Sequence, residues 1–149
     1  MNSPDIVIRD MRSEDLDRVS QIENECFTTP WSRDSFEEIL KNDSALYMVA
    51  VCDGEVVANC GVIVAAGEGD ICNVAVDGNH RGRGIAYRLV STVMEQARIR
   101  LSAYAFTLEV RAGNTPAIAL YEKLGFISEG IRPGFYSSPR EDAVIYWKR

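Results

Sequence analysis

A strand, a glycine-bearing loop and the start of a long helix follow one another in residues 74–86, which read VAVDGNHRGRGIA. Apolar residues then recur every four positions from Ile85 to Leu101, a spacing typical of an amphipathic helix. Glycine lets a backbone approach a ligand closely, and the N-terminus of a helix carries a partial positive charge. We therefore predict a diphosphate-binding corner here, although an ordinary turn between a strand and a helix can contain the same glycines.

Two common phosphate-binding motifs do not fit this loop. A Walker loop ends in Gly-Lys followed by Ser or Thr, and the sequence contains no such triplet. The dinucleotide fingerprint requires a third Gly or Ala at the position of Tyr87, in a strand-helix unit that this chain does not begin with. The pattern that remains is Arg-x-x-Gly-x-Ala, from Arg81 to Ala86, after the strand that ends at Val76.

The rest of the chain predicts alternating strands and helices in a single domain that spans residues 1–149. Asp53-Gly54, between two Val-rich segments, is a strong hairpin signal. Ser13, Ser32 and Thr115 are expected to cap helices, and the last two strands are expected to flank an aromatic, proline-containing loop. The expected strands are residues 6–8, 45–52, 55–65, 71–76, 105–110, 126–131 and 143–148, and the expected helices are residues 13–26, 32–40, 85–101 and 115–124.

This order of elements predicts an α/β protein with a mixed sheet. The sheet should be mostly antiparallel, because a meander comes first, with one parallel crossover around the long helix. Helices should cover both of its faces. A chain of 149 residues, 46% of them hydrophobic, is long enough to bury a sizeable core.

Charge and hydropathy exclude several classes of protein. The chain has 16 Lys and Arg against 22 Asp and Glu, a net charge of −6, which argues against direct nucleic-acid binding. The longest apolar runs have the length of strands, so we expect no membrane association through a spanning helix. The first residues lack the pattern of a signal peptide. We therefore expect a cytoplasmic protein that handles small anions or basic partners.

The cysteines do not predict a metal site. Cys26, Cys52, Cys60 and Cys72 are far apart, and the chain has a single histidine. Zinc requires about four clustered nitrogen or sulfur ligands, so we expect no metal. Reduced cysteine that fills small spaces in the core is the favoured interpretation, with an exposed Cys26 thiol or a disulfide as alternatives.

The segment from Arg81 to Ala86 resembles the acetyl-coenzyme A motif of the GNAT N-acetyltransferases, Gln/Arg-x-x-Gly-x-Gly/Ala. Leu108–Arg111 and Ala117–Phe126 look like the closing half of the same fold. Pro30-Trp31-Ser32, and Tyr136 with the segment from Glu141 to Ala143, are similar to the ribosomal-protein-alanine N-acetyltransferases. The resemblance covers essentially the whole chain and implies the GNAT fold, with acetyl-CoA as the acetyl donor. Gly82 and Ala86 depart from the residues that are commoner in the motif, which could weaken coenzyme affinity.

The same resemblance implies two catalytic residues. Glu109 would act as general base through water, and Tyr121 would protonate the departing coenzyme thiolate. Glu109 alternates with the apolar Leu108 and Val110, so its side chain should point away from them. A free glutamate has a pKa of about 4.3, so burial or a water relay is needed for work near neutrality. Without the resemblance, a solvated strand glutamate and a packed helix tyrosine would be the ordinary interpretations.

The resemblance also implies binding residues. The expected coenzyme contacts are Val74, Ala75, Val76, Arg81, Gly82, Arg83, Gly84, Ile85, Ala86, Tyr87 and Asn114. The expected substrate contacts are Trp31, Tyr136, Glu141 and Asp142.

The favoured function is acetylation of a protein α-amino group, that of an N-terminal alanine on a small-subunit ribosomal protein. The acidic pair Glu141-Asp142 would favour a basic tail as partner. The alternatives are a GNAT enzyme for lysine side chains or small amines, and a non-catalytic acyl-CoA-binding module. A pure binding module would not need the proton-transfer pair of Glu109 and Tyr121.

Overall fold

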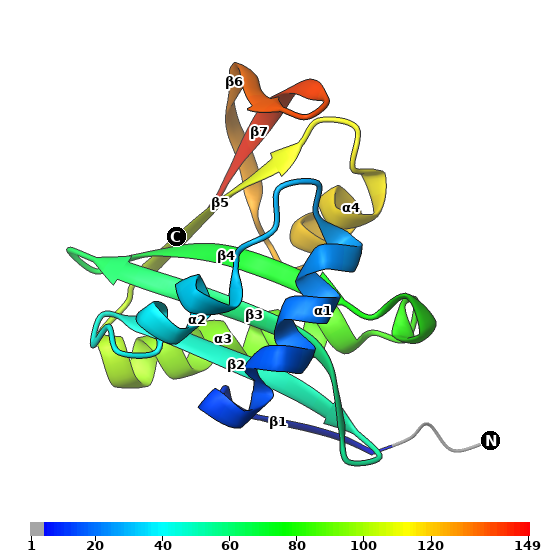
Figure 1. Cartoon of the computed structure of the whole chain (residues 1–149). Coiled ribbons are helices and arrows are strands. Elements are labelled where there is room, and N and C mark those ends of the chain that lie inside the picture. The colour runs from blue at the N-terminus through cyan, green and yellow to red at the C-terminus, as the bar shows by residue number, and fades with distance from the viewer. Residues whose placement is uncertain (1–4) are drawn as a thin grey trace.

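The computed structural model describes residues 5–149, and seven strands within this range form one sheet in the order β1-β2-β3-β4-β5-β7-β6 (Figure 1). All neighbouring strands are antiparallel except β4 and β5, so the predicted mixed sheet with one parallel crossover is confirmed. The strands are β1 (Ile6–Asp10), β2 (Ala45–Cys52), β3 (Glu55–Ala65), β4 (Glu68–Val76), β5 (Ala105–Arg111), β6 (Ile127–Ser137) and β7 (Arg140–Lys148). The helices are α1 (Leu16–Cys26), α2 (Arg33–Ile39), α3 (Ile85–Leu101) and α4 (Thr115–Lys123), with two short 3₁₀ turns at Ser13–Asp15 and Gly78–His80.

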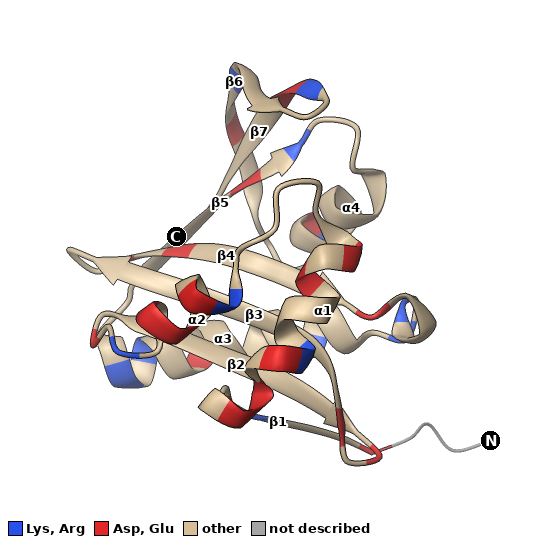
Figure 2. Cartoon of the chain, viewed as in Figure 1, with Lys and Arg blue, Asp and Glu red and all other residues tan. Residues whose placement is uncertain are grey.

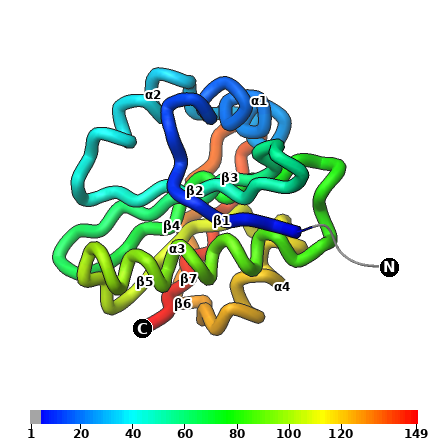
Figure 3. Tube along the Cα trace, turned by 90° about the horizontal axis from the view of Figure 1, so that it is seen from below, coloured from blue at the N-terminus to red at the C-terminus, as the bar shows by residue number. Residues whose placement is uncertain are grey.

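Helices cover both faces of the sheet, as the sequence predicts. Figure 3 shows α1 and α2 on one face and α3 and α4 on the other. Val19 and Phe36 are fully buried against Val49 on the first face, and Val93 and Phe106 are fully buried in the core of the second. Each such side chain contributes roughly 1.5–3 kcal/mol by leaving water. The sheet is therefore held by two separate apolar cores.

The helix starts agree only in part with the predicted caps. The Ser32 hydroxyl accepts a hydrogen bond from the backbone N–H of Ser35 at 3.1 Å, so the predicted cap of α2 is confirmed. The chain enters α1 through the 3₁₀ turn at Ser13–Asp15, without the predicted Ser13 cap. Asn114 rather than Thr115 caps α4, because its side-chain oxygen accepts the N–H of Ala117 at 3.3 Å.

The expected loop between the last two strands is instead a continuous β6–β7 hairpin. The two strands pair from Ile127↔Trp147 to Ser137↔Arg140, so the aromatic segment belongs to the sheet. The register shifts between Arg132 and Tyr136, where Pro133 and Gly134 lie. A proline is tolerated there because β6 is an edge strand, and one side of its backbone needs no partner.

The parallel pair β4–β5 is short, and this opens the sheet. Only Glu68–Asp70 pair with Ala105–Thr107, and beyond them the two strands diverge (Figure 1). On its other side β4 remains paired with β3, with a register shift at Asn73. Residues 74–76 therefore have backbone groups on the β5 side that no strand uses.

No helix within residues 5–149 is long and apolar enough to cross a membrane.

Candidate active site

The glycine loop before α3 has the geometry of an anion cradle. Gly82 and Gly84 both have φ near 76°, a left-handed conformation that favours glycine. Gly84 is the N-cap of α3, and no side chain of the described residues caps this end. The N–H groups of the first turn thus lack helical acceptors. A Cβ built at either glycine meets no atom of the described residues within 4 Å beyond its chain neighbours, so the space beside both glycines is open. Donors and space together fit a diphosphate.

Basic side chains surround this loop. A half-enclosed cavity of about 460 Å³ lies beside it. Its lining residues are Ile6, Cys52, His80, Gly82, Arg83, Ile85 and Arg88. Arg81 has a different place, because its Nε donates to the carbonyl of Val76 at 3.2 Å and its Nη2 contacts the Cys26 sulfur at 3.3 Å. Arg83 and Arg88 therefore supply positive charge at this cavity, whereas Arg81 ties the end of β4 to α1.

The start of α3 lies beside the end of α4. The ammonium group of Lys123 is 5.0 Å from the ring centre of Tyr87, which joins the two helices. Asn114, at the other end of α4, uses its side-chain oxygen as the helix cap, and its side-chain N–H₂ makes no hydrogen bond within residues 5–149. The two predicted coenzyme contacts therefore lie at opposite ends of α4.

Tyr121 is almost fully buried on α4. Its residue surface is 7% exposed, and its ring packs edge-on against Phe126 with centroids 5.9 Å apart. Its hydroxyl makes no hydrogen bond to the described residues. Burial raises the pKa of Tyr121, and the neighbouring Cys60 and Tyr136 act in the same direction. The phenol therefore keeps its proton at neutral pH, which is the form that a general acid requires.

Glu109 points to the opposite side of β5 from the core. Its neighbours Leu108 and Val110 are buried, whereas about a third of the Glu109 side chain is exposed, at 32%. Its carboxylate forms an ion pair with Arg132 of β6 at 3.5 Å. Asp70 of β4 is a second carboxylate nearby: desolvation raises the pKa of Asp70, repulsion from Glu109 adds to this, and Arg132 opposes it.

Tyr136 interacts electrostatically with both predicted catalytic residues. The Arg111 guanidinium lies 4.3 Å from its ring centre. Desolvation raises the pKa of Tyr136, and the charge of Glu109 contributes to the rise. Tyr136 in turn is an electrostatic neighbour of Tyr121. The fold thus brings Glu109, Tyr121 and Tyr136 to the region where the sheet opens, from β5, α4 and β6.

Glu141 and Asp142 accept hydrogen bonds from within the chain. One oxygen of Glu141 accepts the N–H of Gly113 at 2.6 Å, and the other faces Arg111 at 3.3 Å. Asp142 accepts the N–H of Gly134 at 2.8 Å. These carboxylates hold the loop before α4 and the outer part of β6, so their role is at least partly structural.

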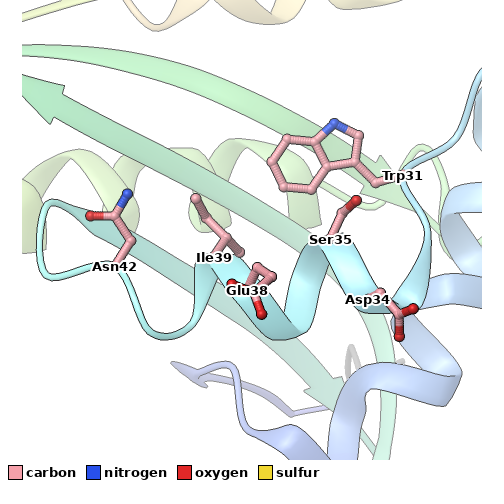
Figure 4. Close-up of a pocket in the computed structure, with 6 residues that line it drawn as sticks. All are labelled: Trp31, Asp34, Ser35, Glu38, Ile39 and Asn42. Atoms are coloured by element: carbon pink, nitrogen blue, oxygen red, sulfur yellow. The ribbon is translucent and has the colours of Figure 1, made fainter.

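Trp31 lies on the α1–α2 side of the sheet. Its indole packs against Phe36 and Tyr47, with ring centroids 5.3 and 5.9 Å apart. It also lines an open groove of about 500 Å³ that runs along α2 (Figure 4). The other lining residues are Asp34, Ser35, Glu38, Ile39 and Asn42. Figure 2 shows acidic positions recurring along α1 and α2 on this face.

Comparison with known proteins agrees with this geometry. The family model described as "Acetyltransferase (GNAT) family" matches residues 16–126. The chain belongs to the GNAT acetyltransferase family. It is an N-acetyltransferase with the GNAT fold, and this fold implies binding of acetyl-CoA.

This acetyltransferase has relatives that match it over nearly their whole length. It is 38% identical over 141 residues to the putative [ribosomal protein bS18]-alanine N-acetyltransferase of Bacillus subtilis, covering 94% of this chain and 93% of that protein. It is 30% identical over 153 residues to an N-alpha-acetyltransferase of Saccharolobus solfataricus, covering 95% and 91%. The crystal structure of the ribosomal-protein-S18-alanine N-acetyltransferase from Escherichia coli superposes with a TM-score of 0.86 at 30% identity, covering 95% and 92%.

The four cysteines of this acetyltransferase are all free thiols. Cys52 and Cys60 are buried, whereas Cys26 and Cys72 are partly exposed. The interpretation of cysteine as reduced core filler is thus confirmed for the buried pair. Within residues 5–149, no three His, Cys, Asp or Glu side chains gather as a metal site.

Sequence reasoning missed three side chains that the fold brings to this region. Arg132 and Asp70 reach Glu109 from β6 and β4, and Asn73 forms the irregularity of β4. They lie far from Glu109 in the sequence, and no spacing signals their contact. Only Asn73 carries a local hint, because asparagine adopts left-handed backbone more readily than most residues.

Proposed function

We propose that this acetyltransferase transfers an acetyl group from acetyl-CoA to the α-amino group of a protein N-terminus, that of an N-terminal alanine on a small-subunit ribosomal protein. The observation that carries the proposal is the divergence of β4 and β5 after Asp70, beyond which β5 carries the partly exposed carboxylate of Glu109, together with the buried and protonated Tyr121 on α4. The names of the Bacillus and Escherichia relatives support the choice of substrate.

The chain would hold acetyl-CoA, which supplies an acetyl thioester, along the open edge of β4. The N–H groups of residues 82–86 would bind the diphosphate, aided by the charges of Arg83 and Arg88. Backbone groups of residues 74–76 on the β5 side would orient the pantetheine arm and the acetyl group, because no strand pairs with them there. The Val76 carbonyl is already engaged, since it accepts the Arg81 Nε–H at 3.2 Å. Tyr87 and Asn114 would border the same opening.

Glu109 and Tyr121 would manage the two proton transfers. The carboxylate of Glu109 would take the proton of the attacking amine through a water molecule, and Arg132 holds that carboxylate in place at 3.5 Å. Tyr121 would give its proton to the departing sulfur, since burial keeps the phenol protonated. General acid–base catalysis of this kind contributes about 10²- to 10⁴-fold to the rate.

The pKa of the attacking amine favours an α-amino group over a lysine side chain as the substrate. An α-amino group has a pKa of about 7.7–8.0 and a lysine amine one of about 10.4. At pH 7.5 about a third of α-amines but only about 0.1% of lysine amines are therefore neutral and able to attack. A glutamate that is partly open to solvent is a modest base, and it suits the easier deprotonation.

The peptide would enter between α2 and the β6–β7 hairpin. Trp31 and Tyr136 would contact it, and Glu141 and Asp142 would shape its path by holding their loops. A net charge of −6 and the acidic positions on α1 and α2 favour a basic tail (Figure 2). Ribosomal proteins are made in the cytoplasm, which is where we propose that the enzyme acts.

Mass spectrometry of a peptide panel tests this proposal. The panel contains a peptide that begins Ala-Arg, its counterpart with acidic residues after the alanine, and an N-terminally blocked peptide with lysines. We expect acetylation at the α-amine of the first peptide, less of the second, and none on the blocked peptide. The same panel with Glu109→Gln controls for uncatalysed transfer. Acetyl groups found only on lysine side chains would refute the proposal.

A further inference from the structure

Asn73 has an unusual backbone conformation in the middle of β4. Its φ is 57°, in the left-handed region, although it is neither a glycine nor a turn residue between two strands. The register between β3 and β4 shifts at this point, from Asn59↔Ala75 to Gly61↔Cys72. β4 therefore carries an extra residue here, a bulge that bends the strand. The bulge directly precedes residues 74–76, the edge that faces the opening of the sheet.

Three buried side chains from three different elements hold this bulge. The Tyr47 hydroxyl of β2 donates to the Asn73 side-chain oxygen at 2.8 Å, and the Asn59 amide of β3 donates to the Asn73 carbonyl at 2.8 Å. The Asn73 amide donates to an oxygen of Glu23 on α1, also at 2.8 Å. Glu23, Tyr47 and Asn59 are at most 3% exposed. A non-glycine residue in left-handed backbone persists only where its surroundings hold it, and these contacts supply that hold.

Glu23 is the least ordinary member of this network. A carboxyl group is almost never fully buried without a charged partner, yet Glu23 is 2% exposed and forms no ion pair with the described residues. Its Oε1 accepts a hydrogen bond from the side-chain amide of Asn73 and a second, at 3.5 Å, from the backbone N–H of Trp31. Its Oε2 is buried without a hydrogen-bond partner in residues 5–149, as is the side-chain oxygen of Asn59.

Burial raises the pKa of Glu23, more than its polar neighbours Asn73, Trp31 and Asn59 lower it. The titratable groups that interact with it are Tyr47 of β2 and Cys72 of β4, and neither is a cation. A proton on the carboxyl group removes a buried charge and adds a donor, which matters here because Glu23 Oε2 and Asn59 Oδ1 are buried without a donor from residues 5–149.

We propose that Glu23 is a positioning residue of the acetyltransferase: with Tyr47 and Asn59 it holds Asn73 in the left-handed bulge, and so sets the direction in which residues 74–76 present their backbone N–H and C=O groups to the coenzyme. The inference rests on the proposed function in one respect, because the role of residues 74–76 in holding the coenzyme belongs to that proposal. The same carboxyl group accepts the N–H of Trp31, so it also ties the α1–α2 connection to the bulge.

Two substitutions of Glu23 and one matched control test the inference. Glu23→Gln keeps the shape and an acceptor for Asn73, and its amide offers a donor in place of a carboxyl proton. Glu23→Ala removes the contact, and Glu25→Gln changes an exposed glutamate two residues further along α1. The readouts are the coenzyme Kd by calorimetry, the backbone amide chemical shifts of residues 74–76 in the coenzyme-free protein, and kcat and KM for the peptide.

We expect Glu23→Ala to weaken coenzyme binding by about tenfold, which is about 1.4 kcal/mol, and to move the amide signals of residues 74–76, since the Asn73 side-chain amide then loses its acceptor on α1. Glu23→Gln and Glu25→Gln should stay within about twofold of the wild type. If Glu23→Ala fails to fold, Asn73→Gly serves instead: glycine adopts the left-handed conformation freely but has no side chain for Tyr47 or Glu23 to hold. It should show the same loss of affinity.

Wild-type values in both Glu23→Ala and Asn73→Gly would overturn the inference. So would a Glu23→Gln variant that binds coenzyme normally but loses kcat, because Glu23 would then act through its charge in the reaction rather than by position. The proposed function fails separately, if the wild-type enzyme acetylates no amino terminus. The coenzyme Kd and the amide shifts would still report on the bulge in that case.

Discussion

Replacing Gly84 by alanine should separate coenzyme binding from folding. Gly84 is the N-cap of α3 and has φ near 76°, and a Cβ placed on it meets no atom of the described residues within 4 Å. A methyl group there therefore clashes with nothing in the protein. It adds backbone strain, and it occupies open space at the uncapped start of α3, where we propose that the diphosphate binds.

Both effects have a definite size. An L-residue in the left-handed conformation is less stable than glycine by about 1–2 kcal/mol. For a chain of this length, each 1 kcal/mol lowers Tm by about 2–4 °C. A hydrogen bond to a charged group is worth about 1.5–3 kcal/mol, so the loss of one bond to the diphosphate should raise the coenzyme Kd by roughly 10- to 100-fold.

Gly54→Ala is the matched control. Gly54 has φ near 79° and equally open surroundings, but it lies in the turn between β2 and β3, outside the glycine loop. The two variants should lose similar stability in urea unfolding followed by circular dichroism. Calorimetric titration with coenzyme A should show weaker binding for Gly84→Ala and wild-type binding for Gly54→Ala.

Two results would refute the reasoning. If Gly84→Ala is folded and binds coenzyme A with the wild-type Kd, the diphosphate does not lie against residues 82–86. If Gly54→Ala loses as much affinity as Gly84→Ala, the loss reflects general destabilisation rather than contact with the ligand.

Three further predictions concern the buried and exposed acids of the site. Tyr121→Phe keeps the ring that packs on Phe126 but removes the proton donor, so kcat should fall by about 10²-fold or more while the coenzyme Kd stays unchanged in calorimetry. Glu109→Gln should lower the rate by a similar factor, and more at pH 6.5 than at pH 8.5, where more of the amine is already neutral; equal losses at both pH values would exclude Glu109 as the base. Burial raises the pKa of Glu23 in the folded protein above its pKa of about 4.3 in the unfolded chain, so the free energy of unfolding should fall as pH rises from about 4.3 through the folded pKa. The urea midpoint should show this decline in the wild type and lack it in Glu23→Gln.

Local chemistry accounts for the elements that the sequence predicted well. The helix from Ile85 to Leu101 has the predicted bounds, because its apolar spacing and its glycine start are both local signals. Ser32 and the Asp53-Gly54 turn are equally local. The sequence predicts a loop for the outer part of β6, because Pro133 and Gly134 ordinarily break strands, and only the pairing with β7 at a sheet edge makes them tolerable.

The candidate site also has a part that local sequence predicts and a part that only the folded sheet brings together. The glycine loop could be predicted from consecutive residues, and the alternation along β5 placed Glu109 on the face away from the core. The partners of Glu109 could not be predicted, since Arg132 and Asp70 reach it only through the strand order of the finished sheet. Glu23 could not be predicted either: its position on α1 suits a solvated acid, and its burial follows from the packing of α1 on β4.

The bulge at Asn73 and the divergence of β4 from β5 both keep residues 74–76 from pairing with β5. If β4 paired with β5 as far as Val76, the backbone groups of residues 74–76 would bond to a neighbouring strand and could not bind a ligand. Pairing stops after Asp70, and the bulge at Asn73 bends β4 just beyond that point, while β3 continues to hold its other side. The apolar cores on the two faces can thus stabilise the sheet without those groups. Substitutions in the network around Asn73 should therefore affect coenzyme binding more than their effect on stability would suggest, because the network holds a segment of β4 that pairs with β3 alone and leaves its β5 side open to a ligand.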